Sequence, residues 1–161
     1  MSSLRIGNGF DVHAFCEGRD LILGGVKIDF HKGLAGHSDA DVLIHSIIDS
    51  LLGASGIGDI GRLFPDSDSK FKDISSLILL SEVFNILKKR NIKIINTDSV
   101  IVCERPKISP YINEMQKILS QTLNSEVSPQ SIGIKATTSE RLGFTGREEG
   151  IAVYTVSLIE L

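Results

Sequence analysis

Tryptophan is absent from the sequence, and cysteine occurs only twice, at Cys16 and Cys103. Without tryptophan, few aromatic surfaces are available on which the bases of a single-stranded nucleic acid could stack. Two cysteines exclude a disulfide-dense scaffold, and the lack of a CxxC pair excludes the usual structural zinc sites. These absences favour a protein of a reducing compartment that does not bind nucleic acid.

Long hydrophobic runs and an excess of positive charge are also missing. No apolar stretch reaches transmembrane length, and the N-terminal residues lack the apolar core of a signal peptide. The net charge is −3, whereas binding to a phosphate backbone requires surplus Lys and Arg. We therefore expect a cytoplasmic protein without membrane or nucleic-acid partners. Any phosphate that it binds would be held locally, by a metal ion, a few basic side chains and backbone N–H groups.

The composition is that of a globular protein, with 42% apolar and 23% charged residues. The length of 161 residues suits one domain over residues 1–161. The apolar spacing predicts strands at 4–12, 100–103, 131–137 and 151–160, a hairpin at 21–28, and helices that begin with Ser38 as N-cap, near 76 and at Ser109. This order predicts an α+β fold, a mixed β-sheet with helices packed on one face.

Three residues from two segments could hold a metal ion. Asp11 and His13 are two apart in a strand-like segment, so their side chains point to one face. His45 lies four residues from both Asp41 and Asp49 on the core-facing side of the first predicted helix. Such a histidine either hydrogen-bonds to backbone or to a neighbouring carboxylate, or it coordinates a metal. Asp11, His13 and His45 together would leave a fourth position open, as in catalytic zinc sites.

Three further segments are rich in groups that bind polar ligands. Residues 58–68 combine glycines and carboxylates, which suit either a surface turn or a polyol site. Residues 104–109 run from a strand into a capped helix, which is either an ordinary junction or an anion or nucleotide pocket. Residues 135–147 offer hydroxyls, a Lys, an Arg and glycines, and form either a diphosphate cradle or a polar loop. Composition alone leaves each pair of interpretations open.

Together these segments resemble a known family. The sequences that carry the resemblance are RIGNGFDVH at 5–13, GHSDADVLIH at 36–45, GDIG at 58–61, FPDSD at 64–68, KATTSE at 135–140 and GFTGREEG at 143–150. In this order, and spread over essentially the whole chain, they are similar to the 2-C-methyl-D-erythritol 2,4-cyclodiphosphate synthase family, which belongs to the non-mevalonate route to isoprenoids.

The resemblance implies a phosphorus–oxygen lyase. The substrate would be 4-diphosphocytidyl-2-C-methyl-D-erythritol 2-phosphate, whose 2-phosphate attacks the β-phosphorus of its own diphosphate and displaces CMP. No protein nucleophile is needed, so catalysis rests on positioning and electrostatics. The resemblance further implies Zn²⁺ at Asp11, His13 and His45, and a second divalent ion, Mg²⁺ or Mn²⁺, that bridges the substrate phosphates near Glu140.

The same resemblance assigns transition-state stabilisation to His37 and Thr138. Methylerythritol contacts are implied at 59–61 and 64–68, and cytidine and diphosphate contacts at 103–109 and 137–140. The full set of implied substrate-binding residues is Asp11, Val12, His13, His37, Ser38, Asp59, Ile60, Gly61, Phe64, Pro65, Asp66, Ser67, Asp68, Cys103, Glu104, Arg105, Pro106, Lys107, Ile108, Ser109, Thr137, Thr138, Ser139, Glu140, Phe144 and Arg147.

The resemblance also implies a homotrimer whose active sites lie between subunits. Phe144 and Arg147 would line a central cavity that can hold an isoprenoid diphosphate. Two other functions stay open at this point. One is a zinc phosphohydrolase, in which the open metal position activates water. The other is a non-catalytic trimer that binds a metal or an isoprenoid.

Overall fold

The computed structural model describes residues 3–65, 68–71 and 73–161. In chain order its strands and α-helices are β1 (Leu4–Cys16), β2 (Leu21–Leu23), β3 (Val26–Ile28), β4 (Gly33–Leu34), α1 (Val42–Ser55), α2 (Ile60–Leu63), α3 (Ser76–Lys89), β5 (Lys93–Val102), α4 (Ile112–Thr122), β6 (Ile132–Thr137), α5 (Gly143–Gly146) and β7 (Gly150–Glu160). Short 3-10 turns occupy Ser69–Phe71, Ser109–Tyr111 and Pro129–Ser131.

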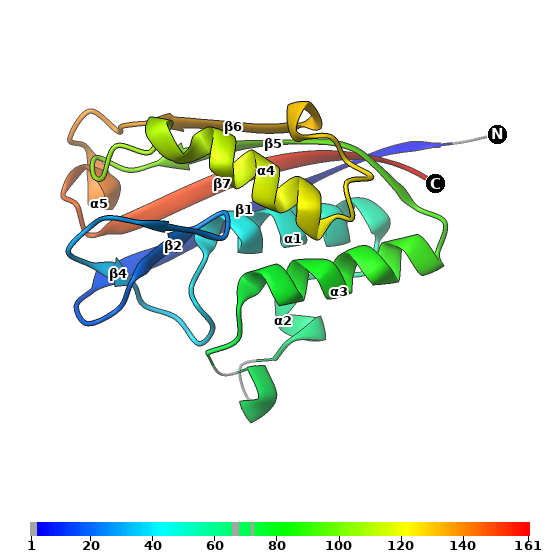
Figure 1. Ribbon diagram of the computed structural model, residues 1–161, viewed down its shortest axis with the longest axis horizontal. Coiled ribbons are helices and arrows are strands. Elements are labelled where there is room, and N and C mark those ends of the chain that lie inside the picture. The colour runs from blue at the N-terminus through cyan, green and yellow to red at the C-terminus, as the bar shows by residue number, and fades with distance from the viewer. Residues whose placement is uncertain (1–2, 66–67, 72) are drawn as a thin grey trace.

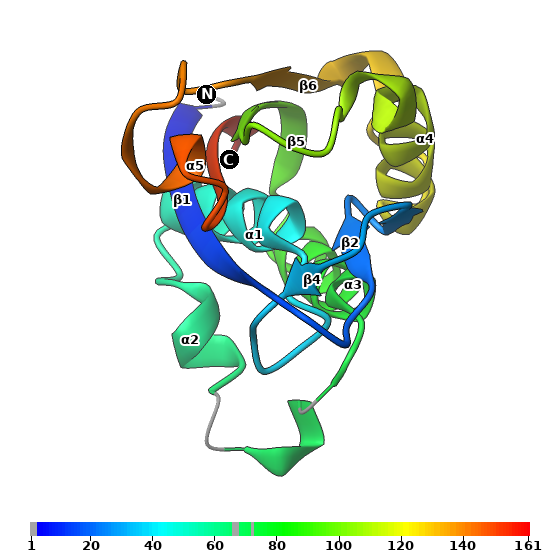
Figure 2. The ribbon, with the colours of Figure 1, turned by 90° about the vertical axis from the view of Figure 1, so that its left-hand side faces the viewer.

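A five-stranded mixed sheet forms the frame of the molecule, in the order β4-β1-β7-β5-β6. The β1–β7 and β5–β7 pairs are antiparallel, and β5 and β6 are parallel. Helices α1 and α3 lie on one side of this sheet, with α1 directly against the strands (Figure 1). Figure 2 shows α1 between the strands and α3. The predicted α+β fold, with a mixed sheet and helices, is confirmed.

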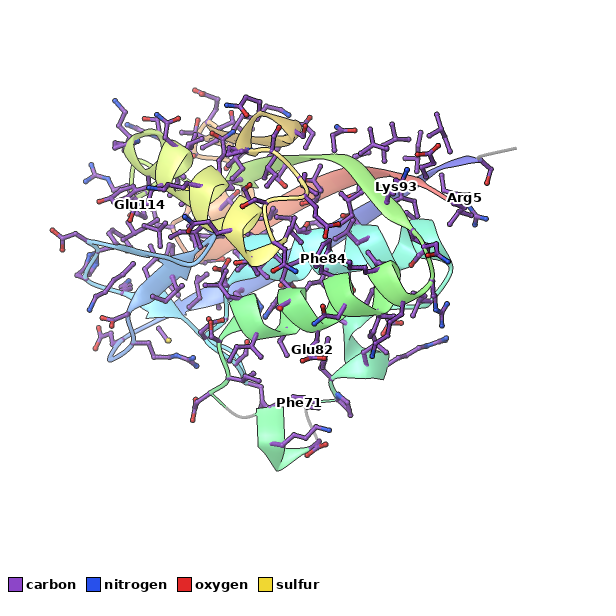
Figure 3. All side chains as sticks on the ribbon, turned by 45° about the vertical axis from the view of Figure 1, so that its right-hand side comes forward. Arg5, Phe71, Glu82, Phe84, Lys93 and Glu114 are labelled. Carbon is purple, nitrogen blue, oxygen red and sulfur yellow. The ribbon has the colours of Figure 1, made fainter. Side chains whose placement is uncertain are left out.

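Helix α3 has one buried and one exposed side. Phe84 is 5% exposed and lies on the side of α3 that faces the rest of the molecule, while Glu82 lies on the outer side (Figure 3). The apolar spacing predicts this arrangement correctly, because residues three and four apart share a helical face. Across the described ranges, no helix combines the length and the apolar character that a membrane crossing requires.

The start of the first helix differs from the prediction. Helix α1 begins at Val42, and its N-cap is Asp41, whose carboxylate accepts a hydrogen bond from the backbone N–H of Ile44 at 3.1 Å. Ala40 has a φ of 57°, in the left-handed region, so the helix cannot continue through it toward Ser38. The hydroxyl oxygen of Ser38 instead accepts the backbone N–H of Ala40 at 3.2 Å and lies 3.1 Å from Nε2 of His45.

Other boundaries also differ. Strand β1 extends to Cys16 instead of ending at residue 12, because its later part pairs with β4 and β7. The predicted hairpin at 21–28 forms, but as a separate two-stranded sheet. The segment 58–68, expected as a loop, contains the short helix α2.

Two glycines bring α1 against β1. A Cβ atom on Gly7 would lie 2.0 Å from the carbonyl oxygen of Ser50, and one on Gly9 would lie 2.0 Å from the carbonyl oxygen of Ser46. Glycine is therefore required for this close approach of the two backbones. Gly7 and Gly9 lie on the same face of β1 as the odd-numbered residues that follow, and that face meets His45 nearer the N-terminal end of α1.

The opposite face of the sheet exposes apolar side chains. Ile6 and Phe10 of β1 are 73% and 47% exposed, and Tyr154 and Val156 of β7 are 55% and 49% exposed. The rings of Phe10 and Tyr154 pack with centroids 4.6 Å apart. An apolar patch of this kind on a sheet face is typical of a protein–protein interface.

Candidate active site

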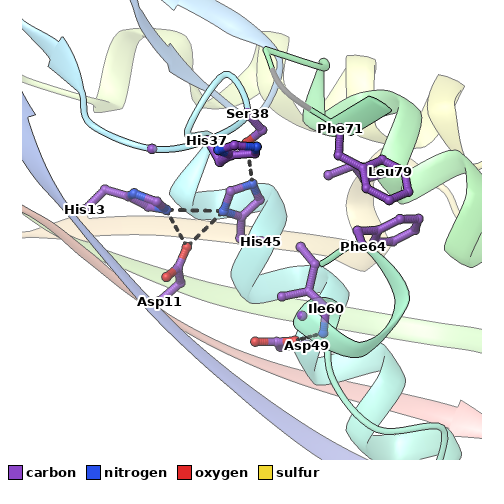
Figure 4. A pocket seen from close by; sticks show the side chains of 12 residues that line it. Asp11, His13, His37, Ser38, His45, Asp49, Ile60, Phe64, Phe71 and Leu79 are labelled. Carbon is purple, nitrogen blue, oxygen red and sulfur yellow. Dashed lines mark hydrogen bonds and ion pairs between the residues drawn. The ribbon is translucent and has the colours of Figure 1, made fainter. Parts of the chain in front are cut away.

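Three side chains from β1 and α1 converge on one point. Oδ2 of Asp11 lies 3.0 Å from Nε2 of His13 and 3.1 Å from Nδ1 of His45, and the two ring nitrogens are 3.2 Å apart (Figure 4). The alternation of β1 brings Asp11 and His13 to the face that α1 covers, and His45 projects toward them from the second turn of α1. The structure thus brings together the three residues that the sequence proposes as metal ligands.

The donor set fits a tetrahedral divalent cation. Bonds of about 2.0–2.1 Å to such an ion place neighbouring ligand atoms about 3.3 Å apart, close to the three distances observed. When neutral, His13 presents a lone pair at this point, because its Nδ1 lies 2.6 Å from the carbonyl oxygen of Ala35 and carries the ring's one N–H. Three protein ligands leave one position of a tetrahedron open, as catalytic sites require.

Mutual attraction shifts the pKa values of Asp11 and His13, the two candidate ligands on β1. Burial alone would raise the pKa of Asp11, but hydrogen bonds and charge from His13 and His45 outweigh burial and hold that pKa well below its usual range. Burial alone would lower the pKa of His13, but the hydrogen bond to Asp11 and its charge raise it instead. An ionised Asp11 is the form that a cation needs.

A cavity of about 270 Å³ opens beside the three candidate ligands. His37, which is exposed, stands at one side, and Phe64 and Phe71 form an apolar wall with ring centroids 5.3 Å apart (Figure 4). Ile60 lines the floor, and its backbone N–H donates to the carboxylate of Asp49 at 2.8 Å. The cavity therefore combines the three candidate metal ligands, a further histidine and an apolar surface. This combination suits a bound molecule that carries phosphate on a carbon skeleton.

Only some of the residues in 58–68 that are predicted to contact methylerythritol line this cavity. Ile60, Gly61 and Phe64 line it, whereas Asp59 caps α2 through a 3.0 Å hydrogen bond from the N–H of Arg62. Pro65 and Asp68 do not appear among its lining residues. The predictions for Asp66 and Ser67 fall outside the described residues.

A second cavity of about 400 Å³ gathers most of the predicted nucleotide contacts. Its lining residues are Cys103, Glu104, Pro106, Lys107, Ile108, Ser109, Ala136, Thr137 and Thr138. Arg105 instead lines neighbouring hollows with Glu104. Burial, followed by the charge of Glu104, raises the pKa of Cys103 to about 11, so its thiol is neutral at physiological pH.

Glu104 organises the loop that follows β6. Its Oε1 accepts hydrogen bonds from the backbone N–H groups of Ser139 and Arg141, at 3.2 and 3.0 Å. Glu140 and Arg141 have φ values of 52° and 65°, so the loop needs such external support. The hydroxyl of Thr138 donates to Glu140 at 2.9 Å. The family resemblance places Glu104 among the substrate contacts, but no feature of the neighbouring sequence indicates that it supports this loop.

The structure keeps the two predicted catalytic residues apart within one chain. His37 lines the first cavity and Thr138 the second, and these two cavities share no lining residue. The side chain of Val12 is on the exposed face of β1, opposite Asp11 and His13. Phe144 and Arg147 lie at α5 and just after it, and line neither cavity.

Residues not proposed from the sequence also shape the site. Arg19 donates to the carbonyl oxygens of Gly36, at 2.7 Å, and of Ser38, so its guanidinium holds the segment that carries His37. Ser76, the first residue of α3, lies 2.9 Å from Nε2 of His45. Arg19 lies 17 residues before Gly36 and Ser76 lies 31 residues after His45, and no motif links either residue to its partner.

Comparison with known proteins agrees with the geometry. The model of the YgbB family matches residues 4–160. The chain belongs to the YgbB family. A YgbB relative from Caldicellulosiruptor bescii, named 2-C-methyl-D-erythritol 2,4-cyclodiphosphate synthase, is 59% identical over 155 residues, which cover 96% of this chain and 98% of the relative. The family resemblance carried by the six sequence blocks is thereby confirmed.

Solved structures show the same YgbB fold. The bifunctional IspDF from Campylobacter jejuni superposes with a TM-score of 0.94 at 42% identity, and the match covers 99% of this chain and 43% of that longer one. IspF from Plasmodium falciparum, solved as a CDP complex, gives a TM-score of 0.84 at 36% identity, with 98% and 96% of the two chains covered.

Proposed function

We propose that this protein is a 2-C-methyl-D-erythritol 2,4-cyclodiphosphate synthase of isoprenoid biosynthesis. It would convert 4-diphosphocytidyl-2-C-methyl-D-erythritol 2-phosphate into the cyclic diphosphate and CMP. The observation that carries the proposal is the convergence of Asp11, His13 and His45 within 3.2 Å beside a cavity, in a chain of this family. In the reaction, an oxygen of the 2-phosphate forms a bond to the β-phosphorus. The bond from that phosphorus to the CMP oxygen breaks, and CMP leaves with the electron pair.

Asp11, His13 and His45 would hold Zn²⁺ or another divalent cation. A cation held there supplies positive charge against the phosphate groups as they approach each other. We further propose a second divalent ion, Mg²⁺ or Mn²⁺, which Glu140 would help to hold and which would supply positive charge to the substrate phosphates. The carboxylate of Glu140 is exposed and accepts a hydrogen bond from the hydroxyl of Thr138, which lines the second cavity. Glu140 therefore lies near enough to that cavity to help hold an ion there.

His37 and Thr138 would stabilise the charge that develops during transfer. His37 is exposed at the first cavity and can donate a hydrogen bond to a phosphate oxygen. The hydroxyl of Thr138 at the second cavity can do the same for the diphosphate. The methylerythritol part would lie along 59–61 and 64–68, and cytidine along 103–109 and 137–140.

A homotrimer with active sites between subunits would reconcile these roles. His37 and Thr138 line different cavities of one chain, so a substrate that contacts both residues needs the second cavity from a neighbouring subunit. The exposed Phe10–Tyr154 pair offers an apolar surface for that association. Phe144 and Arg147 would line a central cavity able to bind an isoprenoid diphosphate. We place the enzyme in the cytoplasm, where Cys16 and Cys103 would stay reduced.

The test is to supply the substrate with Zn²⁺ and Mg²⁺ and to follow the products by ³¹P NMR. The proposal predicts cyclic diphosphate and CMP in equal amounts. Linear phosphate products would instead indicate a zinc phosphohydrolase, and no conversion would indicate a binding protein. His45→Ala should show no turnover, whereas His31→Ala, which changes an exposed histidine outside the three-ligand cluster, should keep it.

A further inference from the structure

Ser76 connects His45 to a carboxylate on another segment. Its side chain is completely buried at the start of α3, with Oγ 2.9 Å from Nε2 of His45. The same hydroxyl donates to Oδ1 of Asp39, and the backbone N–H of Ser76 donates to Oδ2 of Asp39 at 2.9 Å. The carboxylate of Asp39 thus accepts both the backbone N–H and the hydroxyl of Ser76, and the Ser76 hydroxyl in turn contacts His45.

The positions of the hydrogens follow from the chemistry of these groups. An ionised carboxylate only accepts, so the Ser76 hydroxyl hydrogen points to Asp39. Ser76 then offers a lone pair to His45, and Nε2 of His45 must carry the N–H that donates to it. Ser38 provides a second oxygen 3.1 Å from the same nitrogen, and that oxygen already accepts the N–H of Ala40.

This arrangement decides which nitrogen of His45 is free for a metal. A neutral imidazole has one N–H, so an N–H at Nε2 leaves a lone pair on Nδ1. Nδ1 is the atom that faces Asp11 and His13. The alternative tautomer would donate the Nδ1 hydrogen to Oδ2 of Asp11, 3.1 Å away, and would prevent His45 from acting as a ligand.

We propose that Asp39 and Ser76 are positioning residues that hold His45 in its Nε2–H tautomer and fix the orientation of its ring for metal binding. The inference deepens the proposed function, since it concerns the same metal site. Partners of this kind behind a ligating histidine typically change metal affinity about 10–100-fold when removed.

A purely structural role for Asp39 can be separated from this one. The residue also caps α3 through the N–H of Ser76, since the N-cap residue Ser75 makes no side-chain capping bond. Ser76→Ala removes the hydroxyl and keeps that backbone N–H bond. Asp39→Asn keeps an acceptor for the N–H, but its amide NH₂ can donate to the Ser76 hydroxyl. The hydroxyl would then donate to His45, and the favoured tautomer would reverse.

The experiment measures zinc affinity by chelator competition, and it follows the exchange of the His45 Nε2–H with water by ¹⁵N NMR of the zinc-bound protein. The control is Ser120→Ala, which removes a buried hydroxyl bonded to the carbonyl of Val127 far from the site in α4. We expect zinc affinity to fall about 10–100-fold in Ser76→Ala and in Asp39→Asn, and to be unchanged in Ser120→Ala. We also expect the Nε2–H of zinc-bound His45 to exchange faster with water in Ser76→Ala than in the wild type, because its acceptor is removed, and to be unchanged in Ser120→Ala.

Two outcomes would overturn the inference. One is equal zinc affinity in Ser76→Ala, Asp39→Asn and Ser120→Ala. The other is an Nε2–H of zinc-bound His45 whose exchange with water is the same in Ser76→Ala as in the wild type. Failure of the proposed function looks different, because a wild type that binds zinc without making cyclic diphosphate would leave both of these measurements intact.

Discussion

Gly9 of β1 lies so close to α1 that a Cβ atom on it would sit 2.0 Å from the carbonyl oxygen of Ser46. This backbone contact sets the spacing between the strand and the helix. Asp11 and His13 follow on the same face of β1, and His45 precedes Ser46 on α1, so the spacing also sets the distances among the three candidate ligands.

Gly9→Ala should therefore weaken both the fold and the metal site. The added methyl group must push α1 from β1, which costs about 1–3 kcal/mol of unfolding free energy or more. Zinc affinity should fall as well, because His45 moves with the helix. Chemical denaturation and zinc titration measure the two effects. Gly53→Ala is the matched control, because a Cβ atom on Gly53 would meet only the carbonyl oxygen of Asn8, at 3.8 Å. This substitution should lower neither the unfolding free energy nor the zinc affinity.

His45→Ala should abolish zinc binding and turnover while the fold remains. The side chain is only part-buried and lies at a cavity, so its removal leaves the apolar core of α1 in place. Metal analysis, the ³¹P assay and circular dichroism measure the three effects. Full activity in a metal-free His45→Ala protein would refute the role of the cation.

The stabilisation that zinc gives should grow with pH. The folded-state pKa of His13 is raised above its ordinary value of 6.5, so protonated His13 stabilises the metal-free fold fully below pH 6.5. That contribution is lost as the pH rises through the folded-state pKa. Zinc needs the unprotonated ring, so its increment in Tm should be small at about pH 5.5 and larger at about pH 8.5. A zinc increment that is the same at both pH values would contradict this assignment.

Thr138→Val should lose turnover and roughly retain nucleotide binding. Valine keeps the shape of the side chain but removes the hydroxyl, while Cys103 to Ser109 still line the second cavity. Isothermal titration with CDP measures binding, and the ³¹P assay measures turnover. Unchanged turnover would remove Thr138 from the mechanism.

The three candidate ligands converge as the sequence predicted, because local periodicity determines which side chains share a face. Asp11 and His13 alternate correctly on β1, and His45 lies on the inner side of α1. The start of α1 was predicted wrongly, since the left-handed backbone of Ala40 has no signature in its residue type. Asp39 lay within the sequence block that pointed to the family, but its partner Ser76 lies 37 residues further along the chain.

The support that Glu104 gives to residues 139–141 shows the same limit. Its carboxylate reaches a loop 35 residues later in the chain, after β5 and β6 have paired in parallel. A contact of this kind depends on how the strands pair, so no spacing within the segment 104–109 indicates it.

The most direct test of the account is a titration of metal-depleted protein with zinc, in the presence of saturating Mg²⁺ and substrate. Bound zinc and the rate of cyclic diphosphate formation should rise together and level off at one zinc ion per chain, with no rise in His45→Ala. Full conversion before any zinc is added, or zinc bound at that ratio equally in His45→Ala, would contradict a catalytic cation held by Asp11, His13 and His45.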